Sequence, residues 1–259
     1  MKTVLTIAGS DCSGGAGIQA DIKTITAHKL YASSAITALT AQNTTGVYDI
    51  MEVSPDFLAQ QLDCIFTDIF PDAIKIGMVA STDLIEVIAD KLAQYRAKNI
   101  VLDPVMMSTS GSVLIRTDAT DTLIALLFPL SDIITPNLSE AQCLSNMKIE
   151  TPDQMIPAAK AIVDMCARGV LIKGGHLGGS ADDLYFENGH AHWLRGDRVD
   201  TQNTHGTGCT LSSAIACNLA LGMDKLQSIQ NAKAYITGAL QDGLSLGKGN
   251  GPLNHVFAL

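Results

Sequence analysis

TVLTIAGSDCSGGAGIQAD, residues 3–21, joins a short apolar run to a glycine-rich turn and then to the start of a helix. The run Thr3–Ala8 has consecutive apolar and β-branched residues, which is typical of a strand covered on both faces. The glycines of the turn let the backbone approach a ligand, and they open a helix whose N–H groups can face an anion. The spacing matches neither a P-loop nor a dinucleotide-binding motif. An ordinary tight turn between a strand and a helix would have the same composition.

The same change from an apolar run to a helical pattern recurs along the chain. Six runs have strand character, and they are Thr3–Ala8, Ser34–Leu39, Ala73–Ile76, Ile100–Leu102, Ile133–Thr135 and Val170–Ile172. Alternation of strands with helices favours a parallel sheet with helices on both sides. A later pair of runs, Asp183–Phe186 and Ala191–Leu194, flanks Asn188-Gly189, which is a strong signal for a two-residue hairpin.

Capping residues mark where helices begin between these strands. Ser54-Pro55-Asp56 offers an N-cap, a proline at the first helical position and an early acid, and an apolar face follows as far as Ile69. Thr151-Pro152-Asp153-Gln154 has the pattern of a capping box. Two further helices are predicted over about 208–222 and 226–246.

The composition fits one domain with a large core. The chain has 259 residues, of which 47% are hydrophobic, and no repeat, low-complexity tract or linker divides it. We therefore expect a single α/β domain over residues 1–259, with three layers, α/β/α, and a central mostly parallel sheet. The net charge of −9 argues against nucleic acid or an anionic membrane as the main partner. It does not exclude an anionic nucleotide, because one lysine and a helix N-terminus can make a pocket locally positive.

The cysteines and the apolar runs favour a cytoplasmic protein. The six cysteines are scattered and lack the spacing of a metal site, so we expect free thiols in a reducing compartment. The N-terminal apolar run is too short for a secretion signal, and no run approaches the ~20 residues that span a bilayer.

Polar residues follow several of the predicted strands, at the edge where parallel sheets bind ligands. Asp103 ends one strand and precedes a small polar stretch with glycine, which suits a carboxylate near magnesium and a mobile flap. Asn137 and Glu140 follow the next strand, where they also fit a helix cap and the third position of a capping box. Lys173 emerges from an apolar strand into two glycines, and a phosphate is a natural partner for such a cation. His176, close behind it, is interpreted as a structural or surface residue.

The segment Asn203–Thr210 is the most informative part of the sequence. Gly206, Thr207 and Gly208 can direct successive N–H groups at one point, which makes an anion-binding nest at the start of a helix. Cys209 falls in the first turn, where the helix dipole is expected to lower the pKa of the thiol. Such a nest suits phosphoryl transfer. A glycine-rich helix start that buries a small cysteine remains the alternative.

These motifs together resemble the ribokinase-like enzymes, and specifically the hydroxymethylpyrimidine/phosphomethylpyrimidine kinases. The matches follow the family's order over nearly the whole chain, and they are Gly9–Asp21, Thr40–Thr44, Lys75–Met78, Asp103–Met106, Thr135–Glu140, Lys173–His176, Asn203–Thr210 and Gly247–Pro252. The resemblance implies a ribokinase-like fold, ATP and Mg²⁺ as cofactors, and a homodimer.

The resemblance also implies a role for each matching residue. At the substrate hydroxyl, the base or polar partner would be Cys209, in place of the aspartate that most relatives use. The transferring phosphoryl group would be held by Gly206, Thr207 and Gly208. The pyrimidine pocket would be lined by Asp21, Gln42, Met78 and Val105. ATP would be bound by Lys173, Asn137 and Thr204, and the magnesium region would contain Asp103 and Glu140. A lid would be formed by Met106 to Leu114.

The implied reaction is phosphorylation of 4-amino-5-hydroxymethyl-2-methylpyrimidine, and then of its monophosphate, in thiamin biosynthesis. Some relatives carry Glu at the position of Gln42, which leaves the details of ring recognition open. Close relatives that phosphorylate pyridoxal can carry a second cysteine in the lid, where this chain has Met107-Ser108-Thr109, so the pyrimidine is favoured. The alternatives are a pyridoxal or pyridoxine kinase on the same scaffold, and a pyrimidine-binding relative without catalysis.

Overall fold

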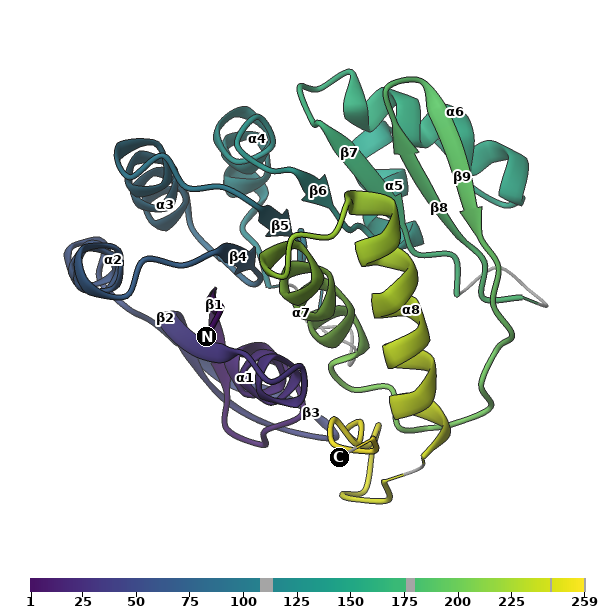
Figure 1. Ribbon diagram of the computed structural model, residues 1–259, viewed down its shortest axis with the longest axis horizontal. Coiled ribbons are helices and arrows are strands. Elements are labelled where there is room, and N and C mark those ends of the chain that lie inside the picture. Colours follow the sequence, from purple (N-terminus) through teal and green to yellow (C-terminus); the bar gives the residue numbers. More distant parts are fainter. Residues whose placement is uncertain (108–113, 176–179, 243, 259) are drawn as a thin grey trace.

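The computed structural model describes residues 1–107, 114–175, 180–242 and 244–258. Within these ranges nine strands form one sheet in the order β3-β2-β1-β4-β5-β6-β7-β8-β9 (Figure 1). Neighbouring strands from β2 to β7 run parallel, whereas β3, β8 and β9 pair antiparallel. The strands are β1 (Thr3–Asp11), β2 (Tyr31–Asn43), β3 (Gly46–Glu52), β4 (Ala73–Ile76), β5 (Ile100–Leu102), β6 (Ile133–Ile134), β7 (Gly169–Ile172), β8 (Asp183–Glu187) and β9 (His190–Leu194). The predicted mostly parallel sheet is confirmed.

Helices cover both faces of this sheet, which makes three layers. Leu62, Ile88 and Met155, from α2, α3 and α6, belong to one buried cluster, whereas Ile25 and Ile215, from α1 and α7, belong to a second one. Figure 1 shows α1, α7 and α8 together in front of the sheet. The helices are α1 (Gly17–Ala27), α2 (Pro55–Asp68), α3 (Thr82–Gln94), α4 (Thr117–Leu126), α5 (Leu138–Ser145), α6 (Pro152–Val163), α7 (Thr207–Ala220) and α8 (Lys225–Gln241).

The strands near the middle of the sheet lie where the sequence predicts them. All four residues of β4 and of β7 are buried, as expected for runs without alternation. The hairpin between β8 and β9 is also confirmed, because Asn188 and Gly189 both have positive φ, at 51° and 79°.

The edge of the sheet differs from the prediction. β2 is longer than the predicted run Ser34–Leu39, and it continues into a hairpin with β3, which the sequence reading did not identify. β3 is an edge strand and exposes much of its surface, so its sequence lacks the apolar run that reveals a buried strand.

The predicted helix starts are confirmed where capping residues mark them. The Ser54 hydroxyl accepts the N–H of Phe57 at 3.2 Å, and Gln154 Oε1 accepts the N–H of Thr151 at 3.0 Å. The last helix ends at Gln241 rather than near residue 246. No helix in the described ranges is long and apolar enough to cross a membrane.

Candidate active site

A glycine turn begins α7 at the carboxyl edge of the sheet. Gly206 is the N-cap, with φ of 84° in the left-handed region. A Cβ on Gly206 would overlap the carbonyl oxygen of Gly15, in the turn that follows β1. Glycine is therefore required here both by the backbone angle and by the close approach of two chain segments.

The N–H groups of the nest differ in their partners. Thr207 directs its N–H and its hydroxyl back to the carbonyl oxygen of Thr204, at 3.3 and 2.8 Å. Gly208 and Cys209 are the next residues of α7, and N–H groups at this level have no partner within a helix. Thr207 thus braces the turn, Gly208 and Cys209 offer N–H groups at the start of α7, and anion binding by the predicted nest of Gly206, Thr207 and Gly208 stays a prediction.

An ion pair between a half-buried lysine and a buried aspartate lies opposite this helix start. Lys173 Nζ contacts Asp103 Oδ1 at 2.8 Å, and the Thr135 hydroxyl donates to the same oxygen at 3.1 Å. A Cβ on Gly208 would stand 3.2 Å from Asp103 Oδ2 and 3.4 Å from Lys173 Nζ. The tertiary structure thus brings together residues from β5, β7 and α7 that lie far apart in the sequence.

Glu140 completes this acidic and basic cluster. Its carboxylate accepts the N–H of Asn137 at 2.7 Å, while Asn137 Oδ1 accepts the N–H of Glu140 at 2.9 Å, so the capping box is confirmed. Burial raises the pKa of Glu140 to about 6, since the effect of nearby Asp103 adds to it and Lys173 only partly opposes it. Burial by itself lowers the pKa of Lys173, but Asp103 and Glu140 outweigh it and the net shift is upward.

A second ion pair lies beneath the site. Lys75 Nζ contacts both carboxylate oxygens of Asp21, at 3.0 and 2.8 Å, and both side chains are fully buried. The hydroxyls of Thr6 and Ser213 donate to the same carboxylate at 2.6 and 2.7 Å. These four contacts occupy the acceptor positions of the carboxylate. The contact of Asp21 with a substrate ring stays a prediction, and the geometry instead makes this residue the partner of Lys75.

Cys209 lies between these groups, and the expectation about its thiol is wrong. Burial raises the pKa of Cys209 to about 11, and Asp21 and Asp103 add to the shift, while Lys75 and the N–H of Gly17 lower the pKa without cancelling it. The sequence argument considered only the dipole of α7. Buried carboxylates near the sulfur and the loss of water outweigh that dipole. The thiol is therefore protonated at neutral pH.

The other residues of the predicted pyrimidine pocket lie on three neighbouring segments. Gln42 is half-buried near the end of β2, and its backbone N–H and carbonyl contact Cys12 Sγ at 3.4 and 3.1 Å. Met78 is buried just after β4, with its sulfur against Gly9. Val105 is half-buried two residues after Asp103. Their contact with a substrate stays a prediction.

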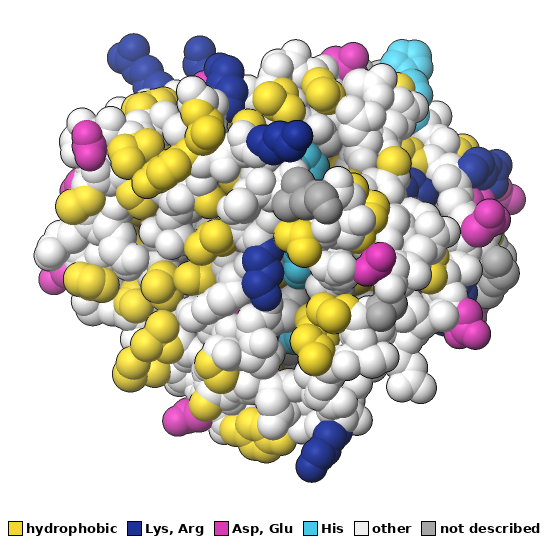
Figure 2. Space-filling model, turned by 60° about the horizontal axis from the view of Figure 1, so that its bottom comes forward, with side chains coloured by type: hydrophobic (Ala, Val, Ile, Leu, Met, Phe, Trp, Pro, Cys, Tyr) yellow, Lys and Arg dark blue, Asp and Glu magenta, His cyan; other side chains and the backbone are white. Residues whose placement is uncertain are grey.

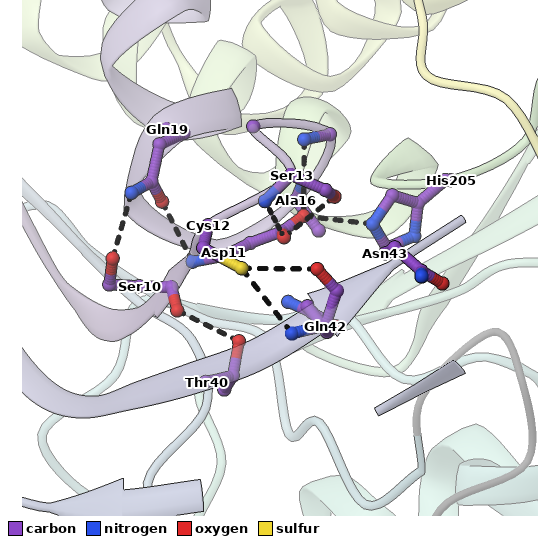
Figure 3. A network of polar contacts seen from close by, with 12 residues as sticks. Ser10, Asp11, Cys12, Ser13, Ala16, Gln19, Thr40, Gln42, Asn43 and His205 are labelled. Atoms are coloured by element: carbon purple, nitrogen blue, oxygen red, sulfur yellow. Dashed lines mark hydrogen bonds and ion pairs between the residues drawn. The ribbon is translucent and has the colours of Figure 1, made fainter. Parts of the chain in front are cut away.

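Sequence reasoning gave no role to Asp11, although the structure makes it the centre of a network (Figure 3). This carboxylate accepts the N–H groups of Ser13, Gly15 and Ala16, the Ser13 hydroxyl, and an N–H···O contact from His205 Nε2 at 2.8 Å. Burial tends to raise the pKa of Asp11, but these hydrogen bonds lower it to about 2. The available signal was an acid at the end of a strand followed by Ser and Gly, which is typical of a turn that the carboxylate caps.

A cavity of about 260 Å³ lies beside this network. Its walls come from the turn after β1, the β2–β3 hairpin, the segment before α7 and the C-terminal segment, through Ser13, Asn43, Thr44, His205, Leu246, Gly247 and Pro252. The match of the sequence Gly247–Pro252 to a family motif thus corresponds to a wall of this hollow.

The side chains around Asp103 suit a metal ion that is held partly by substrate phosphates rather than by protein ligands alone. Among the described residues, no three His, Cys, Asp or Glu side chains could hold a metal ion by themselves. Mg²⁺ commonly takes one or two carboxylates together with substrate phosphates. Asp103 Oδ2, which faces Gly208, fits this role better than Glu140, whose two oxygens face backbone N–H groups of Asn137 and Met106. Two predicted features, residues 108–113 of the lid and His176, lie outside the described residues.

Two solved structures of vitamin kinases are similar to this chain over nearly its full length. A pyridoxal kinase of Bacillus subtilis, in an ADP complex, has a TM-score of 0.91 and 38% identity, and the match covers 98% of this chain and 97% of that one. A phosphomethylpyrimidine kinase of Clostridium difficile 630 has a TM-score of 0.83 and 42% identity, over 93% of this chain and 100% of that one. The protein is therefore a kinase with the ribokinase-like fold.

The family model described as phosphomethylpyrimidine kinase matches residues 11–254, and the chain belongs to this family. Hydroxymethylpyrimidine/phosphomethylpyrimidine kinases of Rhizobium meliloti and Escherichia coli are 46% and 44% identical, over 97% and 98% of this chain and 96% and 97% of their own lengths. A thiamine biosynthesis bifunctional protein of Geobacter sulfurreducens is 48% identical, and the chain spans 52% of its length. The chain thus spans nearly all of the single-function relatives and about half of the bifunctional one.

Proposed function

We propose that this kinase transfers the γ-phosphoryl group of ATP to the hydroxymethyl oxygen of 4-amino-5-hydroxymethyl-2-methylpyrimidine, and in a second round to the resulting monophosphate. The reaction would serve thiamin biosynthesis, as the name of the Geobacter sulfurreducens relative indicates for that protein. The observation that carries the proposal is the approach of Gly208 to the Lys173–Asp103 pair. Phosphoryl transfer needs fixed donors and cations around the charge that develops, and this arrangement supplies both.

Different residues would bind the transferring phosphoryl group and the rest of ATP. The N–H groups of Gly208 and Cys209 would hold the transferring group, with Gly206 and Thr207 fixing the turn. Lys173 would contact the ATP phosphates, while Asn137 and Thr204 would line the nucleotide site. The ADP complex of the similar pyridoxal kinase supports ATP as the donor.

Magnesium would be held by Asp103, with Glu140 beside it, since Asp103 Oδ2 faces the helix start. When bound, the ion neutralises charge on the phosphate oxygens. The chain's own contribution is to keep Asp103 in place through Thr135 and through its ion pair with Lys173, and to shield the Asp103 carboxylate from water by burial.

Cys209 would orient the acceptor hydroxyl rather than ionise. A thiol with a pKa of about 11 has little thiolate at neutral pH. Phosphoryl transfer passes through a loose transition state in which the acceptor proton leaves late, so positioning matters more than a strong base.

Gln42, Met78 and Val105 would contact the ring, and Gln42 would favour the aminopyrimidine. An amide has donors and an acceptor, which match an amino group beside a ring nitrogen. Pyridoxal kinase is the second candidate, because the B. subtilis enzyme has 38% identity and the same fold. Pyridoxal would leave one side of the amide poorly paired.

The test is kcat/KM for the hydroxymethylpyrimidine, pyridoxal and pyridoxine at saturating Mg-ATP. A buried unpaired polar group costs about 1–3 kcal/mol, so we expect the pyrimidine to be preferred by roughly 5- to 150-fold. Gln42→Leu should shrink that preference, whereas Gln230→Leu, at an exposed position of α8, should leave it unchanged. Equal or greater efficiency with pyridoxal in the wild type would overturn the substrate and leave the kinase class.

The chain would act as a single domain over residues 1–259, in the cytoplasm, as a homodimer. Support for the homodimer comes from one side of the molecule, where large apolar side chains are exposed on β2, β3 and α2. Figure 2 shows hydrophobic side chains gathered on the left of its face, the side on which Figure 1 has α2 and β2. The exposed residues of this apolar face are Leu39, Tyr48, Met51 and Phe57.

A further inference from the structure

The contact between Asp11 and His205 joins two segments that are 194 residues apart in the sequence. Asp11 ends β1 and is 1% exposed, and His205 directly precedes the N-cap of α7 and is 9% exposed. Each residue is also fixed by hydrogen bonds on its own side of the contact. The turn after β1 donates four hydrogen bonds to Asp11, and the backbone N–H of His205 donates to the carbonyl of Gly251 at 3.0 Å.

The two segments also interlock without space between them. A Cβ on Gly15 would overlap the imidazole ring of His205, and a Cβ on Gly206 would overlap the carbonyl oxygen of Gly15. The Cδ2 edge of the ring therefore faces the turn after β1, and the Asp11 contact is the polar link across this seam. A small shift of the ring would move the next residue, Gly206, and with it the start of α7.

The same turn also reaches the strand that carries Gln42. The Asp11 N–H donates to Gln19 Oε1 at 2.8 Å, and the next residue, Cys12, contacts the backbone of Gln42 (Figure 3). The Thr40 hydroxyl donates to the carbonyl of Ser10 at 2.9 Å. One turn of backbone is thus connected both to the nest and to the end of β2.

We propose that Asp11 and His205 form a positioning pair that fixes the nest of α7 relative to the turn after β1, and thereby relative to the acceptor hydroxyl. Neither residue is placed against the reacting atoms, so both act through Gly206, Gly208 and Cys209. This inference rests on the proposed role of the nest in phosphoryl transfer. Misplacement of reacting groups by about 1 Å costs on the order of 10²-fold in rate, and binding of a substrate by its distant parts is less affected.

The test compares two substitutions of His205 that differ in reach. The side-chain amide of Gln extends about as far as Nε2 of histidine, whereas that of Asn ends one bond short. His205→Asn should lower kcat by about 10²-fold and change the KM for Mg-ATP by less than about threefold. His205→Gln restores a donor to Asp11 and should recover at least about tenfold of that loss.

A matched control separates this effect from a general loss of stability. His255 is also buried and also contacts α7, through the Thr210 hydroxyl at 3.0 Å, but it lies outside the nest. His255→Asn should lower the melting temperature about as much as His205→Asn and keep kcat within about threefold. Asp11→Asn leaves a single side-chain oxygen to accept from the five donors that contact Asp11. This variant is tested in place of His205→Asn if His205→Asn does not fold.

The proposal is overturned if His205→Asn, or Asp11→Asn in its place, keeps the wild-type kcat per folded molecule, or if Gln is no better than Asn at position 205. Each ratio is taken on whichever alcohol the wild type phosphorylates best. A wrong substrate assignment therefore leaves the ratios intact, and the failure of one proposal is distinguishable from the failure of the other.

Discussion

At the scale of single residues, burial decides how the acids and the thiol of the site are charged. The pKa of Glu140 rises to about 6 and that of Cys209 to about 11, because both lose water and lie near other carboxylates. Asp11 is buried as well, yet its pKa falls to about 2, because donors surround it. The pKa is thus raised at two buried groups, Glu140 and Cys209, and lowered at a third, Asp11. The number of hydrogen-bond donors around each group accounts for the difference.

The protonated thiol of Cys209 leads to the first prediction. If the thiol orients the acceptor hydroxyl, Cys209→Ala should lower kcat by about 10²-fold with little change in ATP binding. Cys209→Ser retains a hydroxyl of similar reach that does not ionise, and it should keep kcat within about tenfold. Steady-state kinetics with a calorimetric titration of Mg-ATP would measure both. A serine variant as poor as the alanine variant would indicate that Cys209 acts as a base, and a normal alanine variant would make it a packed core residue.

The raised pKa of Glu140 predicts a pH-dependent stability. A folded-state pKa of about 6 against an ordinary 4.5 means that the folded protein favours the protonated acid. The protonated acid therefore adds to the free energy of unfolding below a pH of about 4.5, and this contribution is lost as the pH rises through about 6. Glu140→Gln should therefore increase the free energy of unfolding by about 2 kcal/mol at pH near 8 and hardly change it at pH near 4.5.

Urea unfolding of the variant and the wild type at both pH values checks this prediction. Glu150→Gln, at an exposed glutamate, is the control and should be neutral at both. A Glu140→Gln protein that is less stable than the wild type at the higher pH would show that the hydrogen bond to Asn137 outweighs the cost of the buried charge.

At the scale of elements, the site is built where two helices begin. The sulfur of Cys209, in the first turn of α7, lies close enough to Gly17, the first residue of α1, for the Gly17 N–H to lower the pKa of the thiol. Gly206 allows this arrangement, since its backbone angle and its contact with Gly15 exclude any side chain. The strands only place these helix starts at one edge of the sheet.

Gly206→Ala should therefore damage both the fold and the activity. The left-handed region costs roughly 1–2 kcal/mol for a residue with a Cβ, and the overlap with Gly15 displaces the nest. We expect a lower melting temperature and a loss of kcat of at least about tenfold. Gly222→Ala is a matched control, because Gly222 has φ of 88° and a Cβ there would meet nothing within 4 Å. It should show the backbone cost alone, and equal kcat in the two variants would contradict the assignment of the nest.

At the scale of the whole molecule, the sheet ends in two different edges. β9 follows a tight hairpin, whereas β3 lies beside the exposed apolar face of Leu39, Tyr48, Met51 and Phe57. An edge strand with exposed apolar side chains tends to pair with another chain. Association through this face would cover it.

We predict that the wild type sediments as a dimer at micromolar concentration and that Met51→Lys shifts it to a monomer. A lysine at an edge strand opposes pairing, and Met51 is 63% exposed, so the monomer should remain folded. Leu221→Lys, at an exposed position after α7, should leave the dimer intact. A monomeric wild type, or a dimeric Met51→Lys variant, would exclude this face as the interface.

Much of this architecture follows from local sequence patterns. Apolar runs identified β4, β5 and β7, because those strands are buried on both faces, and capping residues identified the starts of α2 and α6. The sequence pattern did not reveal the edge strand β3, since an exposed strand has no such run. Lys173, Asp103 and Gly208 could be singled out as polar or glycine residues at strand or helix ends, and the sheet then brought them together.

The sequence by itself determined the fold class, the order of the motifs and the glycine turn at the start of α7, because each depends on residues within a few positions of one another. Only the tertiary structure decided that Asp21 pairs with Lys75, that Asp11 pairs with His205, and that the thiol of Cys209 is protonated. These properties depend on distances between segments far apart in the chain and on the exclusion of water between them. No local pattern contains either quantity, because both arise when the helices pack on the sheet.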